Sequence, residues 1–410
     1  MEEFIEYLTT EGVRWDTVAW DCYGDPYAYP QIIADNPAYR AMATLPGGVR
    51  LQVRFTAVAT GGRSMRDPIF KLGYEGTDIT AAIAAWVITV DFTDKKEGES
   101  DELSVTIQNS DRRWLNDWFP GTGDRVTLEL GYRNGPTLGP ITFEIDQPEF
   151  SGAPDTLQLK GLATPVSASL RQKKTRAFEN TTLDQIAAQI AADNGLTLVG
   201  SVPAFPFERV TQRNQTDLEF LRQQAADYGL IFKVESCTSL VFFRESDLEA
   251  AEPVRALSLD DYRNYRGSKE SVGTYKSVKV QYLNPQTGDF DSVELDASGA
   301  EVATPQGEEG ETEISSGDVL NIRERFESRA QAEQKATQAL RRANRGQFKL
   351  SLDIEGDPTL SAGSNITVEG LGKLSGTYQI ERIRHALRKS QGYVSSLDLI
   401  GLELGIGDGQ

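Results

Sequence analysis

Few side chains in this sequence have the types and spacing that catalysis requires. His385 is the only histidine in 410 residues, and histidine catalysis or a histidine metal site normally needs a second histidine or converging carboxylates. The carboxylates Asp91, Asp94, Asp101 and Glu102 fall on a predicted strand and in a loop, and nothing marks two of them as a general acid and base. We therefore expect a structural role for His385 and no enzymatic activity.

Motifs for cofactors and metals are also missing from the sequence. It contains no Walker loop, dinucleotide fingerprint, metalloprotease motif or nucleophile elbow. The segment Gly121-Thr122-Gly123 has no following helix of phosphate-loop character, so it is read as a turn. Cys22 and Cys237 are too few and too far apart for a disulfide framework or a zinc site. We expect two buried, reduced thiols, no cofactor and no bound metal.

The net charge of −19 limits the class of partner. Clamping DNA phosphates needs clustered lysine and arginine, so specific nucleic-acid binding is not expected. The acidic excess serves either solubility or an acidic lumen or face past which DNA can slide. Residues 281–322 contain ten carboxylates and no lysine or arginine, which fits an acidic loop, a negatively charged lining or a docking surface.

Targeting signals are not evident in the chain. The N-terminus is acidic, whereas a secretory signal begins with basic residues followed by an apolar stretch. No apolar run approaches the roughly 20 residues that span a bilayer. We expect neither secretion nor membrane insertion.

The elements that must position any functional residue begin with a small module at residues 1–55. A strand at 3–8 precedes a short helix that Asp16 or Thr17 can cap. A second short helix ends at Asn36-Pro37, because proline disfavours a helical residue before it. A turn at Leu45-Pro46-Gly47 then leads into a closing strand at 51–55.

The remainder reads as two β-rich parts with a helical part between them. Strand-forming runs, with clear alternation at 103–107, 126–130 and 275–282, predict strands at 68–72, 85–92, 103–107, 126–130, 141–145 and 156–160, and later at 275–282, 348–354, 365–368, 378–385 and 393–399. A helix is predicted from Arg329 to Arg345, closed by Gly346. Turn residues at short intervals favour barrels or sandwiches for the β-rich parts.

The part between them contains an internal repeat with an offset of 34 residues. One helix begins near Asn180-Thr181-Thr182 and ends at Gly195, and the other begins near Asn214-Gln215-Thr216 and ends at Gly229. Each has an Asn/Thr N-cap, a C-terminal glycine and a following apolar strand. Two copies are too few for a solenoid, so we expect two helix–strand units in one small domain.

These features predict an α+β chain with six segments. They are a small βααβ module (1–55), a linker (56–65), a first β-barrel (66–165), a helix–strand region (166–250), a second β-barrel with one helix (251–400) and a C-terminal tail (401–410).

The first module resembles a LysM domain in the variant that phage tails use as tail protein X. The resemblance rests on the signature residues Asp16, Thr17, Asn36, Pro37, Leu45, Pro46 and Gly47. LysM modules are known for binding N-acetylglucosamine polymers. This one lacks the glycine before Asp-Thr and carries Trp15 and Trp20, so protein docking is the favoured role.

The rest of the chain resembles the late control protein D family of contractile phage tails, which shares its fold with the hub of VgrG proteins. The similar stretches are 87–107, 180–196 with 214–230, and 328–333 before the last strands. The resemblance implies a homotrimeric baseplate hub in the virion tail, assembled in the host cytoplasm. It would join the six-fold tail tube or tube initiator to a three-fold central spike and face the tape-measure protein. The first module would clamp wedge or sheath proteins.

Two other functions stay open. The chain could be a peptidoglycan-binding adaptor that uses the LysM-like module, or a cell-wall hydrolase, which the missing catalytic residues disfavour. The sequence does not distinguish a phage from a bacteriocin or an extracellular injection system.

Overall fold

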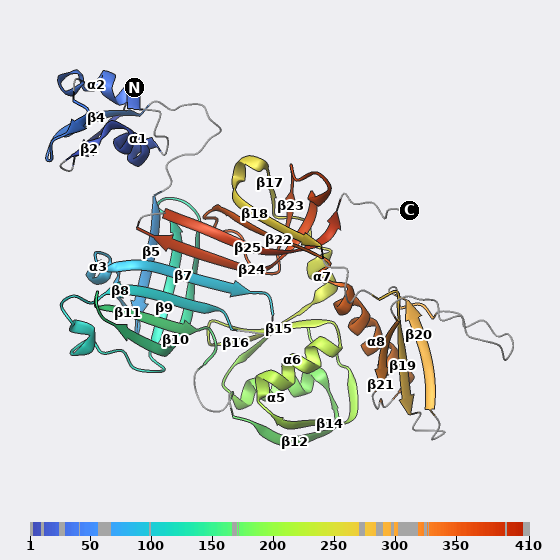
Figure 1. The fold of residues 1–410 in the computed structure, drawn as a ribbon. Coiled ribbons are helices and arrows are strands. Elements are labelled where there is room, and N and C mark those ends of the chain that lie inside the picture. Colours follow the sequence, from blue (N-terminus) through green and yellow to red (C-terminus); the bar gives the residue numbers. More distant parts are fainter. Residues whose placement is uncertain are drawn as a thin grey trace. The chain divides into compact units, whose positions relative to one another are not determined.

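A computed structural model describes all of the 410 residues except 1–2, 10–11, 24–28, 41, 56–66, 98–99, 166–169, 171, 270–274, 284–289, 297–298, 302–318, 324–325, 327, 390–391 and 405–410. The predicted linker and most of the acidic segment therefore lie outside the described residues. The chain divides into two compact units, Met1–Arg66 and Asp67–Gln410 (Figure 1).

The first unit has the strand–helix–helix–strand order expected for it. Strand β1 (Glu3–Leu8) pairs antiparallel with β4 (Arg50–Phe55), and α1 (Trp15–Tyr23) and α2 (Tyr29–Asp35) lie between them in the chain. Two short strands, β2 (Val13–Arg14) and β3 (Thr44–Leu45), and the 3₁₀ turn η2 (Pro37–Tyr39) complete it. Its core comprises Trp15, Val18, Ala19, Ile32, Leu45, Leu51 and Val53.

The cap predicted for the first helix is wrong. Helix α1 begins at Trp15, so Asp16 and Thr17 lie inside its first turn. The carboxylate of Asp16 accepts the amide of the next residue, Thr17, at 2.9 Å. The side chains of Trp20 and Cys22 lie outside the described part.

The second unit is built on a 13-stranded sheet that contains two β-regions. The first β-region comprises β5 (Pro68–Tyr74), β7 (Val87–Lys95), β8 (Glu102–Gln108), β9 (Arg125–Tyr132), β10 (Thr137–Ser151) and β11 (Thr156–Leu162). The second comprises β17 (Arg255–Leu257), β18 (Tyr262–Lys269), β22 (Phe348–Glu355), β23 (Asn365–Val368), β24 (Gly376–Arg388) and β25 (Gly392–Leu404). Small elements β6 (Thr77–Asp78), α3 (Thr80–Ile83), η3 (Arg113–Leu115), η4 (Leu259–Asp261) and η5 (Gly372–Leu374) lie in the connections.

The two β-regions share one strand order. Neighbouring strands in the first run β7-β8-β11-β10-β9-β5, and those in the second run β18-β22-β25-β24-β23-β17. If the six strands of each region are numbered along the chain, both spatial orders read 2-3-6-5-4-1. Each strand of one region therefore has a counterpart in the other. The pairs differ at the end of the path, because β5 is antiparallel to β9 whereas β17 is parallel to β23.

The two β-regions are joined into one sheet, whereas separate barrels were expected. On β24, the pairing with β23 covers only Gly376–Gln379. The next part of that long strand is therefore not paired with β23 on this side. Strand β7 pairs antiparallel with Arg382–Arg388 there. Sequence alternation cannot reveal this joint, because pairing between distant strands depends on which edges the fold leaves open.

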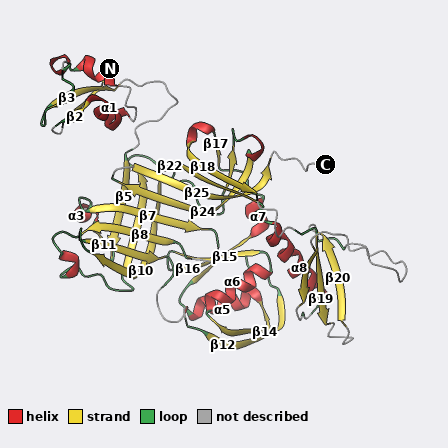
Figure 2. Cartoon of the chain, viewed as in Figure 1, coloured by secondary structure: helices red, strands yellow, loops and turns green. Residues whose placement is uncertain are grey.

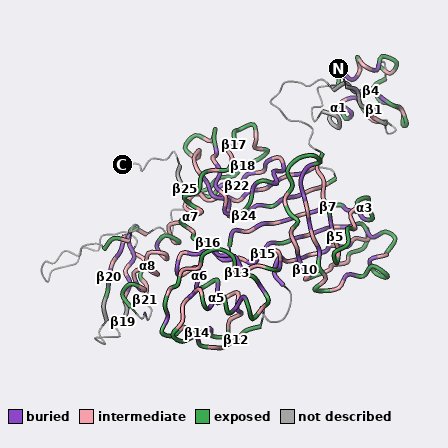
Figure 3. Tube along the Cα trace, turned by 180° about the vertical axis from the view of Figure 1, so that it is seen from behind, coloured by how far each residue is buried: buried purple, intermediate pink, exposed green. Residues whose placement is uncertain are grey.

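Side-chain alternation gives the sheet one buried and one polar face. Buried residues alternate with less buried ones along β7 and β24, both labelled in Figure 3. Buried Phe92, Leu103 and Leu159 belong to the core of the first region, and Leu352, Ile383 and Leu397 to that of the second. Alternation of this kind indicates a sheet covered on one side only.

A helix–strand module follows the first β-region and confirms the 34-residue repeat. It contains β12 (Lys174–Thr182), α5 (Leu183–Asp193), β13 (Thr197–Gly200), β14 (Pro206–Gln215), α6 (Asp217–Asp227), β15 (Leu230–Glu235), β16 (Ser239–Arg244) and α7 (Glu245–Glu249). Both helices start and end 34 residues apart. Gly195 and Gly229 have φ angles of 66° and 69°, the left-handed conformation that ends helices.

The predicted N-caps hold for one helix of the repeat only. Thr216 accepts the amide of Glu219, whose carboxylate accepts the amide of Thr216, so α6 has a complete capping box. Thr182 makes no side-chain cap, and its hydroxyl hydrogen-bonds Asp184. The position matching Glu219 is Gln185, which hydrogen-bonds Thr181.

The predicted second barrel is wrong in part, because some of its residues form a separate third module. Strands β19 (Ser277–Leu283), β20 (Phe290–Asp296) and β21 (Val319–Arg323) form a sheet of their own, and α8 (Arg329–Asn344) packs on it (Figure 2). The buried residues Val278, Val280, Ala336 and Leu340 give it a separate core. The strand at 275–282 and the helix at 329–345 therefore do not belong to the second β-region. The last strand reaches Leu404, beyond the predicted start of the tail.

Candidate functional site

The polar face of the large sheet runs without interruption across eight strands. Cross-strand neighbours share a face, and the registers connect β18, β22, β25, β24, β7, β8, β11 and β10 in series. We call this surface the polar face. Its charged members include Arg266, Lys349, Asp353, Glu355, Arg382, Arg384, Arg388, Asp398, Asp91, Lys95, Glu102, Glu149 and Lys160, and its uncharged polar members include Asn264, Ser268, Ser351, Ser396, Thr89, Thr93, Ser104, Thr106, Gln108, Gln147, Ser151, Thr156 and Gln158.

Opposite charges on the polar face are paired across strands. Arg382 of β24 donates to Asp398 of β25 at 2.7 Å. Arg384 of β24 donates to Asp91 of β7 at 2.8 Å, so one pair crosses the joint between the two β-regions. Exposed pairs of this kind add about 0–1 kcal/mol to stability, and their main effect is on the charge that the surface presents.

The polar face is therefore close to neutral. These strands do not form the acidic face considered from the sequence, because the seven cations and six carboxylates named above nearly balance. Charges of both signs are interspersed on it, so the surface presents no field of one sign.

A buried ionic cluster fastens the helix–strand module beneath one end of this sheet. The ammonium of Lys233 on β15 lies 3.0 Å from Asp94 on β7 and 3.2 Å from Asp101 before β8. The other oxygen of Asp94 accepts the amide of Ala362, from the second β-region, at 2.8 Å. These contacts tie three parts of the unit to the end of β7.

The charges in this cluster are set by burial and by one another. Burial, with the like charge of Asp94, raises the pKa of Asp101 to about 7 although Lys233 opposes the shift. Burial lowers the pKa of Lys233, but the two carboxylates outweigh it and raise that pKa above its usual value. The cluster thus holds one cation between two carboxyl groups, one of which is easily protonated.

A second polar cluster joins the loop after β7 to α7, α8 and β24. Lys96, with a side chain only 1% exposed, donates to Glu381 at 2.5 Å and to Gln379 at 3.2 Å. Arg345, which follows α8, donates to the same glutamate at 2.9 Å and pairs with Glu245. Burial lowers the pKa of both cations. The position of α8 is therefore fixed partly by ion pairs.

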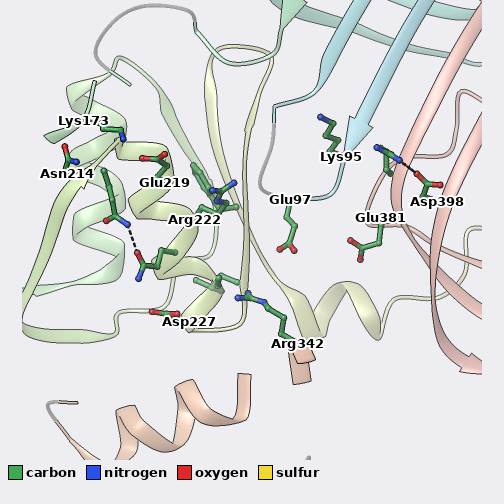
Figure 4. A pocket seen from close by; sticks show the side chains of 16 residues that line it. Lys95, Glu97, Lys173, Asn214, Glu219, Arg222, Asp227, Arg342, Glu381 and Asp398 are labelled. Atoms are coloured by element: carbon green, nitrogen blue, oxygen red, sulfur yellow. Dashed lines mark hydrogen bonds and ion pairs between the residues drawn. The ribbon is translucent and has the colours of Figure 1, made fainter. Parts of the chain in front are cut away.

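A cavity opens between these elements. Its volume is about 1000 Å³. In Figure 4, Lys95, Glu381 and Asp398 of the sheet lie on one side, and Glu219 and Arg222 of α6 on the other. Leu230 and Phe232 supply apolar surface. Carboxylates and cations alternate in its lining, and they form no nucleophile–base pair within hydrogen-bond reach.

His385 is buried in the sheet, which fits the structural role expected from the sequence. It is 1% exposed, its ring stacks on Phe92, and its Nδ1 lies 2.8 Å from the hydroxyl of Tyr393. Burial lowers its pKa to about 4, so the ring is neutral at pH 7. Cys237 is likewise buried, and burial raises its thiol pKa to about 12, so it is unreactive at neutral pH.

Four of the seven signature residues take part in the internal structure of the first unit. Leu45 is a core residue, and the carbonyl of Pro46 accepts the hydroxyl of Thr9 at 2.5 Å. Pro37 begins η2. Asn36 is buried and ties α2 to β4, because it accepts the amide of Gln52 at 2.7 Å and donates to the carbonyls of Ile32 and Gln52.

Replacing Asn36 by alanine is expected to destabilise the first unit by about 1–3 kcal/mol, since buried backbone groups of α2 and β4 lose their partners. Replacing the exposed Thr17 by alanine, a matched change within the same signature, should alter stability by less than about 0.5 kcal/mol. Hydrogen exchange of the β1 and β4 amides would measure both. Equal exchange in the Asn36 variant and the parent would contradict the structural role.

Sequence reasoning missed the polar face and both ionic clusters. The alternation of charged and apolar residues at 348–355 and 382–388 was a usable signal for the face. No signal existed for the clusters, because Lys233 meets Asp94 across 139 positions of the chain. Among the described residues, no group of three histidine, cysteine or carboxylate side chains is arranged to hold a metal ion, and no helix has the length and apolarity to cross a membrane.

Comparison with known proteins identifies the family. A model of the phage tail baseplate hub (GPD) family matches residues 162–391. Probable baseplate hub proteins of Escherichia phages 186 and P2 are 25% and 22% identical over 223 residues, which is 53% of this chain and 56% and 57% of theirs. The match thus spans about half the length of these relatives.

Solved structures share the fold. A tail protein from Neisseria meningitidis MC58 (TM-score 0.61, 12% identity) covers 82% of this chain and 97% of its own, and a 43 kDa tail protein of prophage MuSo2 from Shewanella oneidensis (0.60, 17%) covers 81% and 98%. The Francisella PdpA-VgrG complex (0.50, 10%) covers 81% and 52%. Because the family model matches more than half of its residues, the chain belongs to the phage tail baseplate hub family.

Proposed function

We propose that this hub is a homotrimeric adaptor that joins a six-fold tail tube to a three-fold central spike in the tail baseplate of the virion. The observation that carries the proposal is the repeated strand order of the two β-regions. Three copies of a chain with two equivalent regions present six similar sheets on one side and three copies of everything else on the other.

The polar face would form the wall of the passage through this ring. Its paired charges and polar side chains suit a wall past which DNA or a tape-measure protein moves without adhering. The first unit would dock wedge or sheath proteins, and the fusion raises its effective concentration at the hub. Protein docking is favoured over sugar binding because the module lacks the glycine before Asp16-Thr17 and carries Trp15 and Trp20.

The proposal is tested by the solution mass of the full chain, measured by light scattering alone and with its spike partner. We expect a trimer, or a monomer that becomes trimeric when the spike is added. A monomer that ignores the spike would overturn the adaptor role. Retention on insoluble peptidoglycan would then support the alternative of a wall-binding adaptor.

A further inference from the structure

The cavity between α6 and the end of the large sheet is open to the polar face, and we call it the α6 groove. Its volume of about 1000 Å³ lies at the upper end of the range of roughly 300–1,000 Å³ that is typical of ligand pockets. Lys95, Arg382 and Asp398 line the groove and also belong to the polar face (Figure 4). A molecule that lies along the polar face therefore has access to the groove.

The carboxylates of the α6 groove are mostly committed to partners within the chain. Five of them line it, namely Glu97, Glu219, Asp227, Glu381 and Asp398. Four accept a hydrogen bond from the protein itself: Asp398 from Arg382, Asp227 from Lys335, Glu381 from Lys96 and Glu219 from the amide of Thr216. Among the described residues, only Glu97 of these five has no hydrogen-bond or ion-pair partner.

Two cations of the α6 groove are not committed in this way. Lys173 lies just before β12, and Arg342 lies in the last turn of α8. Both are exposed and line the groove, and neither makes a hydrogen bond or ion pair with a residue that the structure describes (Figure 4). Lys173 also belongs to the run 171–176, which has four basic residues and no acidic one. The charge left for a ligand is therefore positive, two cations against one carboxylate.

Other groups of the groove suit a polypeptide. The side chain of Asn214 makes no hydrogen bond to a described residue, and an amide both donates and accepts, as a peptide group does. Ala226, Leu230 and Phe232 add apolar lining. Nucleic acid is a poorer match, because a phosphate backbone needs cations along its length, whereas five carboxylates line this groove.

We infer that the α6 groove binds an acidic segment of a partner protein that lies along the polar face. Carboxylates of the segment pair with Lys173 and Arg342, its backbone bonds Asn214, and an apolar side chain contacts Leu230 and Phe232. The place of the partner rests on the proposed passage, but binding in the groove does not need the trimer, because its described lining comes from one chain.

Fluorescence anisotropy of the full chain with the labelled peptide Glu-Glu-Phe-Glu-Glu tests the inference. We expect saturable binding that weakens as the salt concentration rises, because exposed charges are screened. The peptide Gln-Gln-Phe-Gln-Gln has the same length and aromatic residue without the carboxylate side chains, and should bind at least about tenfold more weakly. Equal affinities of the two peptides, or no saturable binding of either, would overturn the inference.

Charge reversal on α8 locates the site. Arg342→Glu should weaken binding of the acidic peptide by about tenfold or more, because an attraction becomes a repulsion. Arg341→Glu makes the same change at the next position of the same helix, where the exposed side chain lines a different cavity, so it should keep nearly the parent affinity. Lys173→Glu, on another element, should act like Arg342→Glu. Equal affinities of the Arg341 and Arg342 variants, both with the parent's melting temperature, would contradict the assigned site.

Other occupants of the α6 groove give different results. A single-stranded oligothymidine that competes with the acidic peptide at equal concentration would show a site for any polyanion and would overturn the inference. Peptide binding that appears only when Glu308, Glu309, Glu311 and Glu313 are replaced by glutamine would show that the acidic segment of this chain fills the groove. That result would also overturn the assignment to a partner protein.

Failure of this inference is distinguishable from failure of the hub proposal. If the acidic peptide binds as expected and light scattering shows a monomer even with the spike, the groove stands and the proposed passage falls. If light scattering shows a spike-bound trimer and the peptide does not bind, the hub stands and the groove has no such ligand.

Discussion

Replacing Asp217 by alanine is expected to destabilise the second unit by about 3–5 kcal/mol, because it leaves buried donors and cations without their partner. The Asp217 side chain is fully buried. It accepts Lys174 at 2.5 Å, Arg176 at 2.8 Å and Gln212 at 2.9 Å. Urea unfolding followed by circular dichroism would measure the loss, and a change below about 1 kcal/mol would contradict the role of this carboxylate.

The same carboxylate predicts a pH dependence. Burial opposes its charge, but hydrogen bonds from Lys174, Gln212 and Asn194 outweigh burial and lower its pKa below 3.8. A carboxyl group with a lowered folded pKa stabilises the protein above its unfolded pKa, and that contribution disappears as the pH falls towards the folded value. The difference in stability between the parent and Asp217→Asn should therefore be full at pH 6 and shrink below about pH 4. Asp184→Asn, in the first turn of α5, is the control.

Replacing Lys233 by methionine should cost about 3–5 kcal/mol, because two carboxyl groups stay buried without their cation. Asp101 has a raised pKa, and a group of that kind favours the folded state at low pH and loses its contribution as the pH rises through the folded pKa of about 7. The loss in the variant should thus be larger at pH 8 than at pH 5. Thermal unfolding at both pH values would measure it.

Two further variants make the Lys233 prediction specific. Adding Asp94→Asn and Asp101→Asn removes the buried charges, and should recover most of the lost stability. Lys335→Met breaks a less buried pair with Asp227 at 2.8 Å on another side of the module, and should cost less than about 1 kcal/mol. Equal losses for Lys335→Met and Lys233→Met would show that burial of the cluster does not matter.

The sequence predicted helices and strands well where a repeat or a strand-forming run marked them. The 34-residue repeat is present as α5 and α6, and the C-terminal end of each helix is followed by a glycine in the left-handed conformation. Strand-forming runs in the sequence located β7, β8, β22 and β25 within a few residues. The cap of α5 was wrong, because the hydroxyl of Thr182 bonds Asp184 rather than the backbone of the helix. Capping depends on side-chain geometry that residue types do not determine.

What the sequence determined by itself was the class of each segment and the absence of familiar catalytic and cofactor motifs, since periodicity, turn residues and composition act over short distances. Tertiary structure alone decided that β7 pairs with β24, that residues 275–345 form a separate module and that Lys233 lies between two aspartates. The β7–β24 pairing joins residues nearly 300 positions apart, and the Lys233 cluster joins residues 132 and 139 positions apart. Both depend on which edges and cavities remain once the local elements have packed.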